Sequence, residues 1–149
     1  MINEGSTFPD FLLMDQDGRQ WRLQDFSGAM VVFYFYPKDD TSGCTVEACE
    51  FRDELPHFAS VQVVGVSPDA PKSHRKFAEK YSLPFTLLAD VDHVLAEACG
   101  VWVEKSMYGR TYMGIERSTF LVDADGVVLR IWRKVKPQGH AEEVLQAIT

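Results

Sequence analysis

Cysteine is scarce in this sequence, with three residues among 149. A low and odd number does not fit the even framework of disulfides that stabilises small secreted domains. In a reducing compartment, cysteines of this kind are typically catalytic, bound to a metal or buried in the core. The spacing of the three cysteines therefore has to decide among these roles.

Long hydrophobic runs are also missing, and no leader segment is expected. The longest apolar run, Met30 to Tyr36, is far too short to cross a bilayer. The first nine residues have neither the basic start nor the apolar centre of a signal peptide. We therefore expect a cytoplasmic protein that does not enter membranes.

Basic residues are in the minority, with 15 Lys and Arg against 22 Asp and Glu and a net charge of -7. A field of this sign repels phosphate backbones and anionic lipids, so neither nucleic acid nor a membrane surface is an expected partner. No glycine-rich phosphate loop occurs either. Four histidines stand at no metal-ligand spacing from the cysteines at 44 and 49, so we expect no metal site. We expect these histidines to be solvated or paired locally: His57, His74, His93 and His140.

The residues that are present suit one ordinary globular domain. The chain is 46% hydrophobic and 25% charged, and no repeat, linker or low-complexity stretch interrupts it. A chain of this length buries enough apolar surface to fold without disulfide bonds. We expect a single domain over residues 1–149.

Apolar runs alternate with segments of helical periodicity. Met30 to Tyr36 and Val61 to Val66 are typical of strands buried on both faces, whereas Thr45 to Phe58 and Pro71 to Tyr81 have helical spacing. This alternation favours parallel strands. The other expected elements are a hairpin of Phe11–Met14 and Gln20–Leu23, a strand Pro84–Ala89, a helix Val94–Ala98, a hairpin of Ser118–Val122 and Val127–Trp132, and a helix Gln138–Ile148. The pattern predicts an α/β fold in which helices flank a central mixed β-sheet, with an N-terminal β-hairpin.

The segment from Pro37 to Cys49 carries the strongest chemical signal. Cys44 stands where a polar loop enters a helix, and the free N–H groups and positive dipole end at a helix start favour a thiolate over a thiol. Thr41, one turn earlier, can cap the helix or hydrogen-bond an oxygen near the sulfur. Pro37 fixes the backbone at the strand exit and can shield Cys44 from water. These three residues suit attack on a peroxide by a thiolate. The departing oxygen of the peroxide gains negative charge and needs hydrogen-bond donors.

Cys49 follows Cys44 by five residues. A sulfenic acid formed at Cys44 needs a second thiol before it oxidises irreversibly. In an intact α-helix the two Cα atoms would lie about 8 to 9 Å apart, whereas a disulfide requires them within about 7 Å. We therefore predict that the first turns of the helix unwind when a Cys44–Cys49 disulfide forms.

The segment Pro37-Lys-Asp-Asp-Thr41-Ser-Gly-Cys44 resembles the peroxiredoxin signature Pro-x-x-x-Thr-x-x-Cys. Its flanks, including Cys44-Thr-Val-Glu-Ala-Cys49, are similar to the peroxiredoxin Q group, also called bacterioferritin comigratory protein. Further pieces of the chain share this resemblance: Phe8-Pro-Asp-Phe11, Val66-Ser-Pro-Asp69, Gly100-Val-Trp102 and Glu116-Arg-Ser-Thr-Phe-Leu-Val-Asp123.

The resemblance implies a thioredoxin-like fold and the reduction of hydrogen peroxide and organic hydroperoxides, with thioredoxin or a similar dithiol protein as reductant. It assigns Cys44 as the peroxidatic cysteine, Cys49 as the resolving cysteine, and Thr41, Pro37 and Arg117 as their partners. A fixed guanidinium favours a thiolate and donates hydrogen bonds to a peroxide oxygen. No cofactor or metal is implied. Because both reacting cysteines lie in one chain, we expect a monomer.

Simpler interpretations remain for each residue. Cys44 and Cys49 can be core cysteines, Thr41 only a helix cap, and Pro37 only a strand terminator. Without the resemblance, Arg117 is best read as a surface ion-pair partner of Glu116 or Asp123. Two further residues carry open interpretations: Cys99 is read as a buried structural cysteine, and Glu47 as a solvated first-turn carboxylate in preference to a partner of Arg117 or Lys38.

Two other functions use the same residues. A disulfide carrier favours Cys-x-x-Cys, and the wider spacing here argues against it. A redox sensor or holdase would instead expose apolar surface when the helix unwinds. Mixing with peroxide separates the three, because only a peroxidase oxidises Cys44 far faster than a free thiol reacts.

Overall fold

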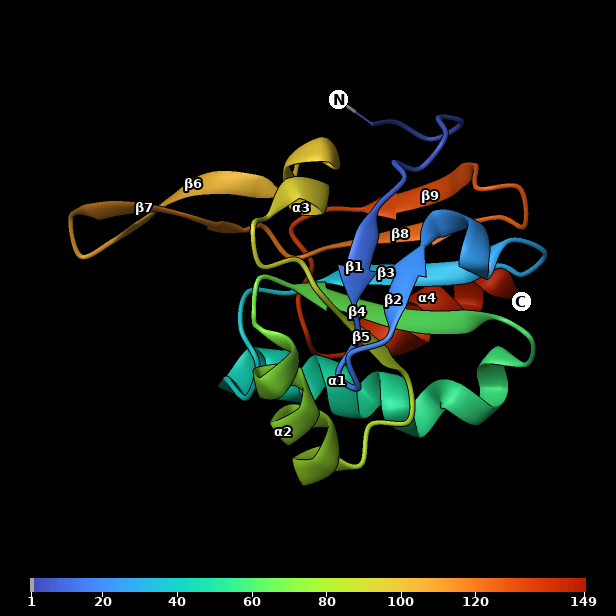
Figure 1. Ribbon diagram of the computed structural model, residues 1–149, viewed down its shortest axis with the longest axis horizontal. Helices are drawn as coiled ribbons and strands as arrows, with labels where there is room; N and C mark the ends of the chain where they lie inside the picture. The colour runs from blue at the N-terminus through green and yellow to red at the C-terminus, as the bar shows by residue number, and fades with distance from the viewer. Residues whose placement is uncertain (1) are drawn as a thin grey trace.

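The apolar run Val31–Phe35 forms the central strand β3, and all of its residues are buried. Successive side chains of a strand point to opposite faces, so Phe33 and Phe35 join one hydrophobic core while Val32 and Tyr34 join another. A strand of this kind has to lie inside a sheet that is covered on both sides. The computed structural model, which describes residues 2–149, has this arrangement (Figure 1).

Seven strands form one mixed sheet in the order β2-β1-β5-β4-β3-β8-β9. Strands β3, β4 and β5 run parallel, and the remaining pairs are antiparallel. Their bounds are β1 Leu12–Met14, β2 Gln20–Arg22, β3 Val31–Phe35, β4 Gln62–Ser67, β5 Thr86–Ala89, β8 Ser118–Val122 and β9 Val128–Trp132. The predicted α/β fold with a central mixed sheet and an N-terminal β-hairpin is confirmed.

Helices cover both faces of the sheet. Side chains from α1, α2 and α4 pack into one core, and α3 packs into the other together with the N-terminal segment. The helices are α1 Ser42–Glu54, α2 Pro71–Tyr81, α3 Val94–Ala98 and α4 His140–Ile148, with short 3-10 helices at Leu23–Phe26 and Leu55–Phe58. Over residues 2–149, no helix is long and apolar enough to cross a membrane.

The predicted helix Thr45 to Phe58 differs from helix α1 at both ends. The α-helix begins earlier, at Ser42, and gives way after Glu54 to a 3-10 turn. Pro56 explains why the α-helix ends before Phe58, because proline has no N–H to donate to a helical hydrogen bond and its ring crowds the preceding turn. The earlier start places Cys44 inside the first turn.

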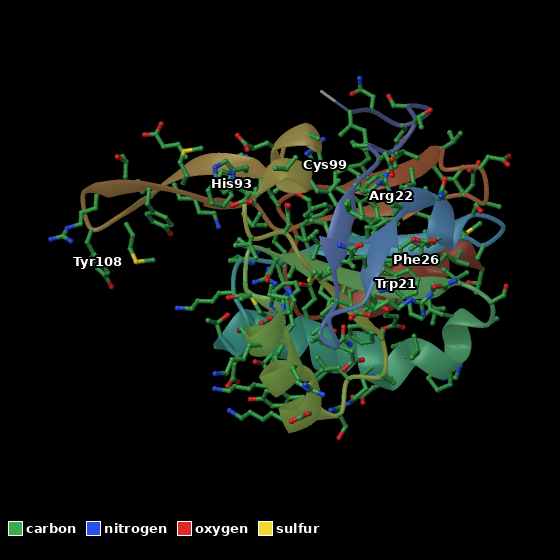
Figure 2. The ribbon with its side chains drawn as sticks, viewed as in Figure 1. Trp21, Arg22, Phe26, His93, Cys99 and Tyr108 are labelled. Carbon is green, nitrogen blue, oxygen red and sulfur yellow. The ribbon has the colours of Figure 1, made fainter. Side chains whose placement is uncertain are left out.

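A second, two-stranded sheet was not predicted from the sequence. Strands β6 (Trp102–Met107) and β7 (Arg110–Ile115) form a hairpin that projects from the body of the molecule (Figure 1). Tyr108, at its tip, is 98% exposed (Figure 2). Most of the hairpin is open to water on both faces, so its sequence lacks the apolar alternation that marks a half-buried strand. The hairpin turns at Tyr108 and Gly109, and both residues have positive φ angles. The glycine is the sequence signal that could have identified this turn.

Candidate active site

Cys44 lies in the first turn of helix α1, just beyond the end of the buried strand β3. The first backbone bond of the helix runs from the amide of Thr45 to the carbonyl of Thr41, at 2.8 Å. The amides before Thr45 have no partner within the helix, and they turn the positive end of the helix toward the thiol. Cys44 is only 2% exposed. The sulfur therefore sits in an electropositive position that is largely shielded from bulk water.

Arg117 approaches Cys44 from the connection between strands β7 and β8. Its Nη2 atom donates to the Sγ atom of Cys44 at 3.4 Å, and its Nη1 atom donates to Oε1 of Glu47 at 2.6 Å. A planar guanidinium that binds two groups through two different nitrogens is fixed in orientation. The interpretation of Arg117 as a surface partner of Glu116 or Asp123 is therefore wrong.

Glu47 is completely buried, which corrects the expectation of a solvated first-turn carboxylate. Burial raises the pKa of Glu47 from 4.5 to about 7, although the neighbouring Arg117 acts in the opposite direction. For Arg117, burial acts to lower the pKa, but the charges of Glu47 and Cys44 outweigh it and raise the pKa. The Oε2 atom of Glu47 has no hydrogen-bond partner in the described structure. The site thus contains a fixed cation next to a carboxyl group that exchanges its proton near neutral pH.

Gly43 allows these groups to come close together. A Cβ atom at this position would lie 3.2 Å from Cγ of Pro137 and 3.3 Å from Nη2 of Arg117. Both distances are shorter than ordinary van der Waals contact. The absent side chain at position 43 is therefore what allows the guanidinium to reach the sulfur beside it.

Thr41 and Pro37 lie in the loop that leads from β3 to α1. Thr41 occupies the N-cap position of the helix, but its hydroxyl donates to the carbonyl of Lys38 at 2.8 Å and caps no helical N–H. The interpretation of its hydroxyl as a helix cap is therefore wrong, and the group closes the loop instead. Pro37 is half-buried at the point where the chain leaves the sheet.

The other two cysteines occupy different environments. Cys49 is half-buried in the same unbroken helix as Cys44, and all three thiols are free. Helix geometry sets the Cα atoms of Cys44 and Cys49 about 8 to 9 Å apart. Cys99 is fully buried in the core on the opposite face of the sheet, and burial raises its pKa well above the usual range. The structure agrees with the interpretation of Cys99 as a buried cysteine.

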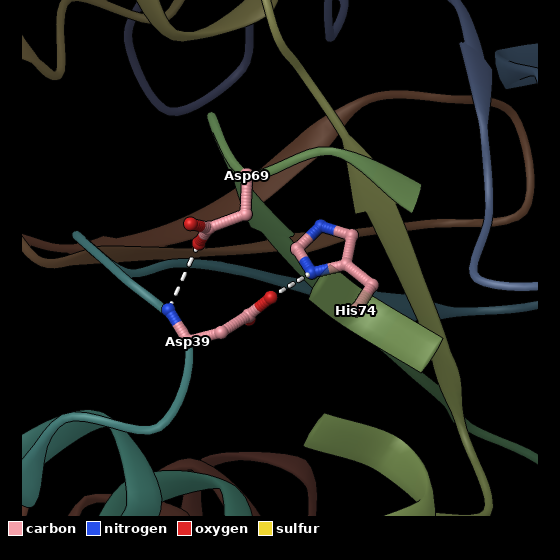
Figure 3. Close-up of side chains that lie close together, drawn as sticks. All are labelled: Asp39, Asp69 and His74. Atoms are coloured by element: carbon pink, nitrogen blue, oxygen red, sulfur yellow. Dashed lines mark hydrogen bonds and ion pairs between the residues drawn. The ribbon is translucent and has the colours of Figure 1, made fainter. Parts of the chain in front are cut away.

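One part of the site was missed by the sequence reasoning. His74 was expected to be solvated or paired locally, but it is completely buried, and its Nδ1 atom lies 2.7 Å from Oδ2 of Asp39 in the loop before Cys44 (Figure 3). Asp39 also receives a hydrogen bond from the buried Tyr36. Partners 35 residues apart leave no local pattern. The signal in the sequence is the polar Ser67-x-Asp69 pair at the end of a buried strand.

Ligand atoms of Asp39, Asp69 and His74 lie within 4.8 Å of one another, the kind of group that can hold a metal ion. In this structure, however, Oδ2 of Asp39 is hydrogen-bonded to Nδ1 of His74, and Oδ2 of Asp69 accepts from the backbone amide of Asp39 (Figure 3). Oδ2 of Asp69 also accepts from the hydroxyl of Ser67. Ligands of a metal must point at a common centre that lies between them. The three residues therefore form a hydrogen-bonded unit.

Known proteins resemble this chain over nearly its whole length. Residues 5–131 match the AhpC/TSA family. The chain is 50% identical to peroxiredoxin Bcp of Bacillus subtilis over 149 residues, which cover 99% of this chain and 95% of that protein. Among solved structures, the bacterioferritin comigratory protein of Xanthomonas campestris is 45% identical with a TM-score of 0.88, over 93% of this chain and 89% of the other. A peroxiredoxin Q variant of Xylella fastidiosa is 40% identical with a TM-score of 0.94, over 99% and 96%.

These neighbours confirm the thioredoxin-like fold expected from the sequence. The family match spans most of the chain, and the curated relative is identical at half of its aligned positions. The chain belongs to the AhpC/TSA family and is a peroxiredoxin, a thiol-dependent peroxidase.

Proposed function

We propose that the protein reduces hydrogen peroxide and organic hydroperoxides with Cys44 as the attacking thiolate. The observation that carries this proposal is the contact between Arg117 and Cys44, made at the start of helix α1 and fixed from the other side by Glu47. The sulfur attacks the terminal oxygen and the O–O bond breaks. The departing oxygen takes up a proton and leaves as water or an alcohol, and Cys44 becomes a sulfenic acid.

Arg117 has two roles in this step. Before the reaction, its Nη2 atom holds the Cys44 sulfur at the start of helix α1. As the O–O bond breaks, negative charge moves to the departing oxygen, and a guanidinium already held in place can donate to it without reorganisation. The hydroxyl of Thr41 and the turn at Pro37 shape the loop beside the sulfur and complete the proposed catalytic group.

The second step of the proposal is resolution by Cys49. Its thiol attacks the Cys44 sulfur, water leaves, and an intramolecular disulfide forms. Because an intact helix holds the two Cα atoms too far apart for a disulfide, the first turns of α1 must unwind. Amide exchange of the reduced and oxidised forms tests this: the amides from 45 to 52 should lose protection on oxidation, and equal protection in both forms would contradict it.

The third step is reduction of the disulfide by thioredoxin or a similar dithiol protein, which supplies two electrons and two protons. The substrate class is supported by the Xanthomonas campestris relative, which is described by its alkyl peroxide reduction activity. The cycle uses sulfur chemistry alone and requires no metal, haem, flavin or nicotinamide. We place it in one domain, residues 1–149, acting as a monomer in the cytoplasm, where thiols are kept reduced.

Three variants test the proposal. Cys44→Ser should abolish peroxide consumption and leave the fold intact, whereas Cys49→Ser should complete one turnover and then stall. Cys99→Ser is the matched control and should behave as the parent protein. Mass spectrometry of the peroxide-treated parent should find Cys44 linked to Cys49. Undiminished turnover by Cys44→Ser, or parent Cys44 reacting no faster than a free thiol, would favour a disulfide carrier or a redox sensor instead.

A further inference from the structure

The carboxylate of Asp39 is the centre of a buried hydrogen-bond network beside the proposed active site. Asp39 is 7% exposed. Its Oδ1 atom accepts from the hydroxyl of Tyr36 at 2.6 Å, and its Oδ2 atom lies 2.8 Å from Oγ of Ser73 and 2.7 Å from Nδ1 of His74. Tyr36 follows strand β3, while Ser73 and His74 belong to helix α2. One side chain thus ties the loop before Cys44 to two separate elements.

The backbone of the same residue is tied as well. The amide of Asp39 donates to Oδ2 of Asp69 at 2.8 Å (Figure 3). That oxygen also accepts from the hydroxyl of Ser67 at 2.6 Å. Ser67 ends strand β4, and Asp69 lies between β4 and α2. Side chain and main chain together therefore leave Asp39 little freedom to move relative to the sheet.

The hydrogen bonds of His74 define where protons lie in this network. The Nε2 atom faces the carbonyl of Leu88 at 2.9 Å, and a carbonyl only accepts, so Nε2 carries a hydrogen. The Nδ1 atom faces the carboxylate of Asp39, so one more proton must lie between them. An amide in place of the carboxylate could donate one hydrogen to the Nδ1 atom of a neutral imidazole and the other to Oγ of Ser73. Every contact would then be kept, with the direction of the Ser73 hydrogen bond reversed.

A second tether on the same loop provides a contrast. Asp40 accepts from Nζ of Lys80 and from the hydroxyl of Tyr81, both at 2.8 Å, and these partners also belong to helix α2. Asp40 is exposed, and exposed pairs of this kind contribute little. The buried contacts of Asp39 are therefore the ones that can hold the loop in place.

We propose that Asp39 and His74 form a clamp that positions Cys44, acting as positioning residues for the peroxidatic step; this inference rests on the proposed function. The clamp fixes the loop five residues before Cys44, and the loop sets where the first turn of α1 meets Arg117. It also marks the N-terminal limit of the unwinding that a Cys44–Cys49 disulfide requires. The loop up to Asp39 stays attached to α2 and β4, while the turn that contains Cys44 opens.

The test compares Asp39→Ala, Asp39→Asn and the control Asp40→Asn by stopped-flow mixing with hydrogen peroxide. Misplacing a reactive group by about an ångström can cost up to about 100-fold in rate, and we expect Asp39→Ala to oxidise Cys44 at least about tenfold more slowly. Formation of the disulfide after that step should be unchanged or faster, because the loop is freer. Asp39→Asn and Asp40→Asn should remain within about threefold of the parent.

Exchange of the Thr45 amide, which makes the first helical bond of α1, gives a readout independent of peroxide. Asp39→Ala should speed this exchange in the reduced protein. The milder Tyr36→Phe, which deletes one oxygen, should speed it to a smaller extent. It replaces Asp39→Ala in the test if that variant does not fold. Parent-like oxidation and exchange in both variants would overturn the clamp, as would an Asp39→Asn protein as slow as Asp39→Ala. A parent protein that is sluggish toward peroxide, with faster exchange in Asp39→Ala, would refute the proposed function and leave the clamp standing.

Discussion

The charges around Cys44 come from two side chains that are nearly removed from water. The side chain of Arg117 is 14% exposed and that of Glu47 is fully buried. Electrostatic interactions are stronger in such surroundings than at the surface, and the loss of one partner leaves the other unsatisfied. The proposed peroxidatic step should therefore respond sharply to single substitutions here.

Arg117→Lys should lower the rate of peroxide reduction by about 100-fold, a loss typical of removing one fixed donor. Lysine keeps the positive charge, but its compact ammonium cannot hold the sulfur and the carboxylate through two separate nitrogens. Stopped-flow kinetics at constant pH measures the effect. Arg110→Lys on the exposed hairpin is the control, and an Arg117→Lys rate within twofold of the parent would contradict the assignment.

Glu47→Gln should change how stability depends on pH. The pKa of Glu47 is raised from 4.5 to about 7 by burial, so the folded state holds a proton that the unfolded chain releases. Its stabilising contribution is complete below pH 4.5 and is lost as the pH rises to about 7. Between pH 4.5 and 8 the parent should lose roughly 2 to 3 kcal/mol that the glutamine variant keeps. Urea unfolding across this range is the measurement, with Glu142→Gln as the control; parallel curves for parent and Glu47→Gln would rule out the shift.

At the scale of the element, local sequence signals explain what could be predicted. Helix α2 begins at Pro71 as expected, because proline suits a first helical turn. The start of helix α1 was placed three residues late, since Ser42 and Gly43 are poor helix formers and the helix start is held by tertiary contacts. The hairpin β6–β7 escaped prediction because it buries little of its surface.

In the candidate site too, features with a local sequence signal could be predicted, and features set by tertiary packing could not. The motif around Cys44 could be recognised because its residues are close in sequence. Arg117 could be assigned to the site only through the family resemblance. The burial of Glu47 and the pairing of Asp39 with His74 depend on which elements pack together, and no local pattern records that.

Gly43→Ala tests how tightly the start of helix α1 is packed. Alanine usually stabilises a helix by about 0.5 to 1 kcal/mol relative to glycine, but here its Cβ would press against Pro137 and Arg117. We expect no gain in unfolding free energy and a peroxide reaction that is slower by about fivefold to tenfold. Thermal unfolding and stopped-flow kinetics measure both effects, with the exposed Ser42→Ala as the control; a more stable variant with full activity would show that the contacts relax freely.

At the scale of the whole molecule, exposed apolar side chains occur at several places on the surface, the projecting hairpin among them. Met107, Tyr108 and Met113 are 55%, 98% and 50% exposed. Scattered exposed side chains of this kind are common in monomers and do not by themselves form an interface. The proposed chemistry also needs cysteines from one chain only.

Sedimentation should therefore give a mass near 16.9 kDa for the reduced and the oxidised protein alike. Both forms should keep this mass as the protein concentration increases. If a dimer appears at high concentration and is abolished by Tyr108→Ser, the hairpin is an interface and the monomer proposal is wrong.

The position of Cys99 has a practical consequence. The central sheet separates it from the other two sulfurs, and it is sealed in the opposite core. After exposure to peroxide, intact-protein mass spectra should record the loss of hydrogen expected for a disulfide between positions 44 and 49, while the third thiol stays reduced and becomes open to alkylation only when the chain is denatured. Every molecule thus carries an internal reference that reports, in the same spectrum, whether it was folded when the oxidant reached it.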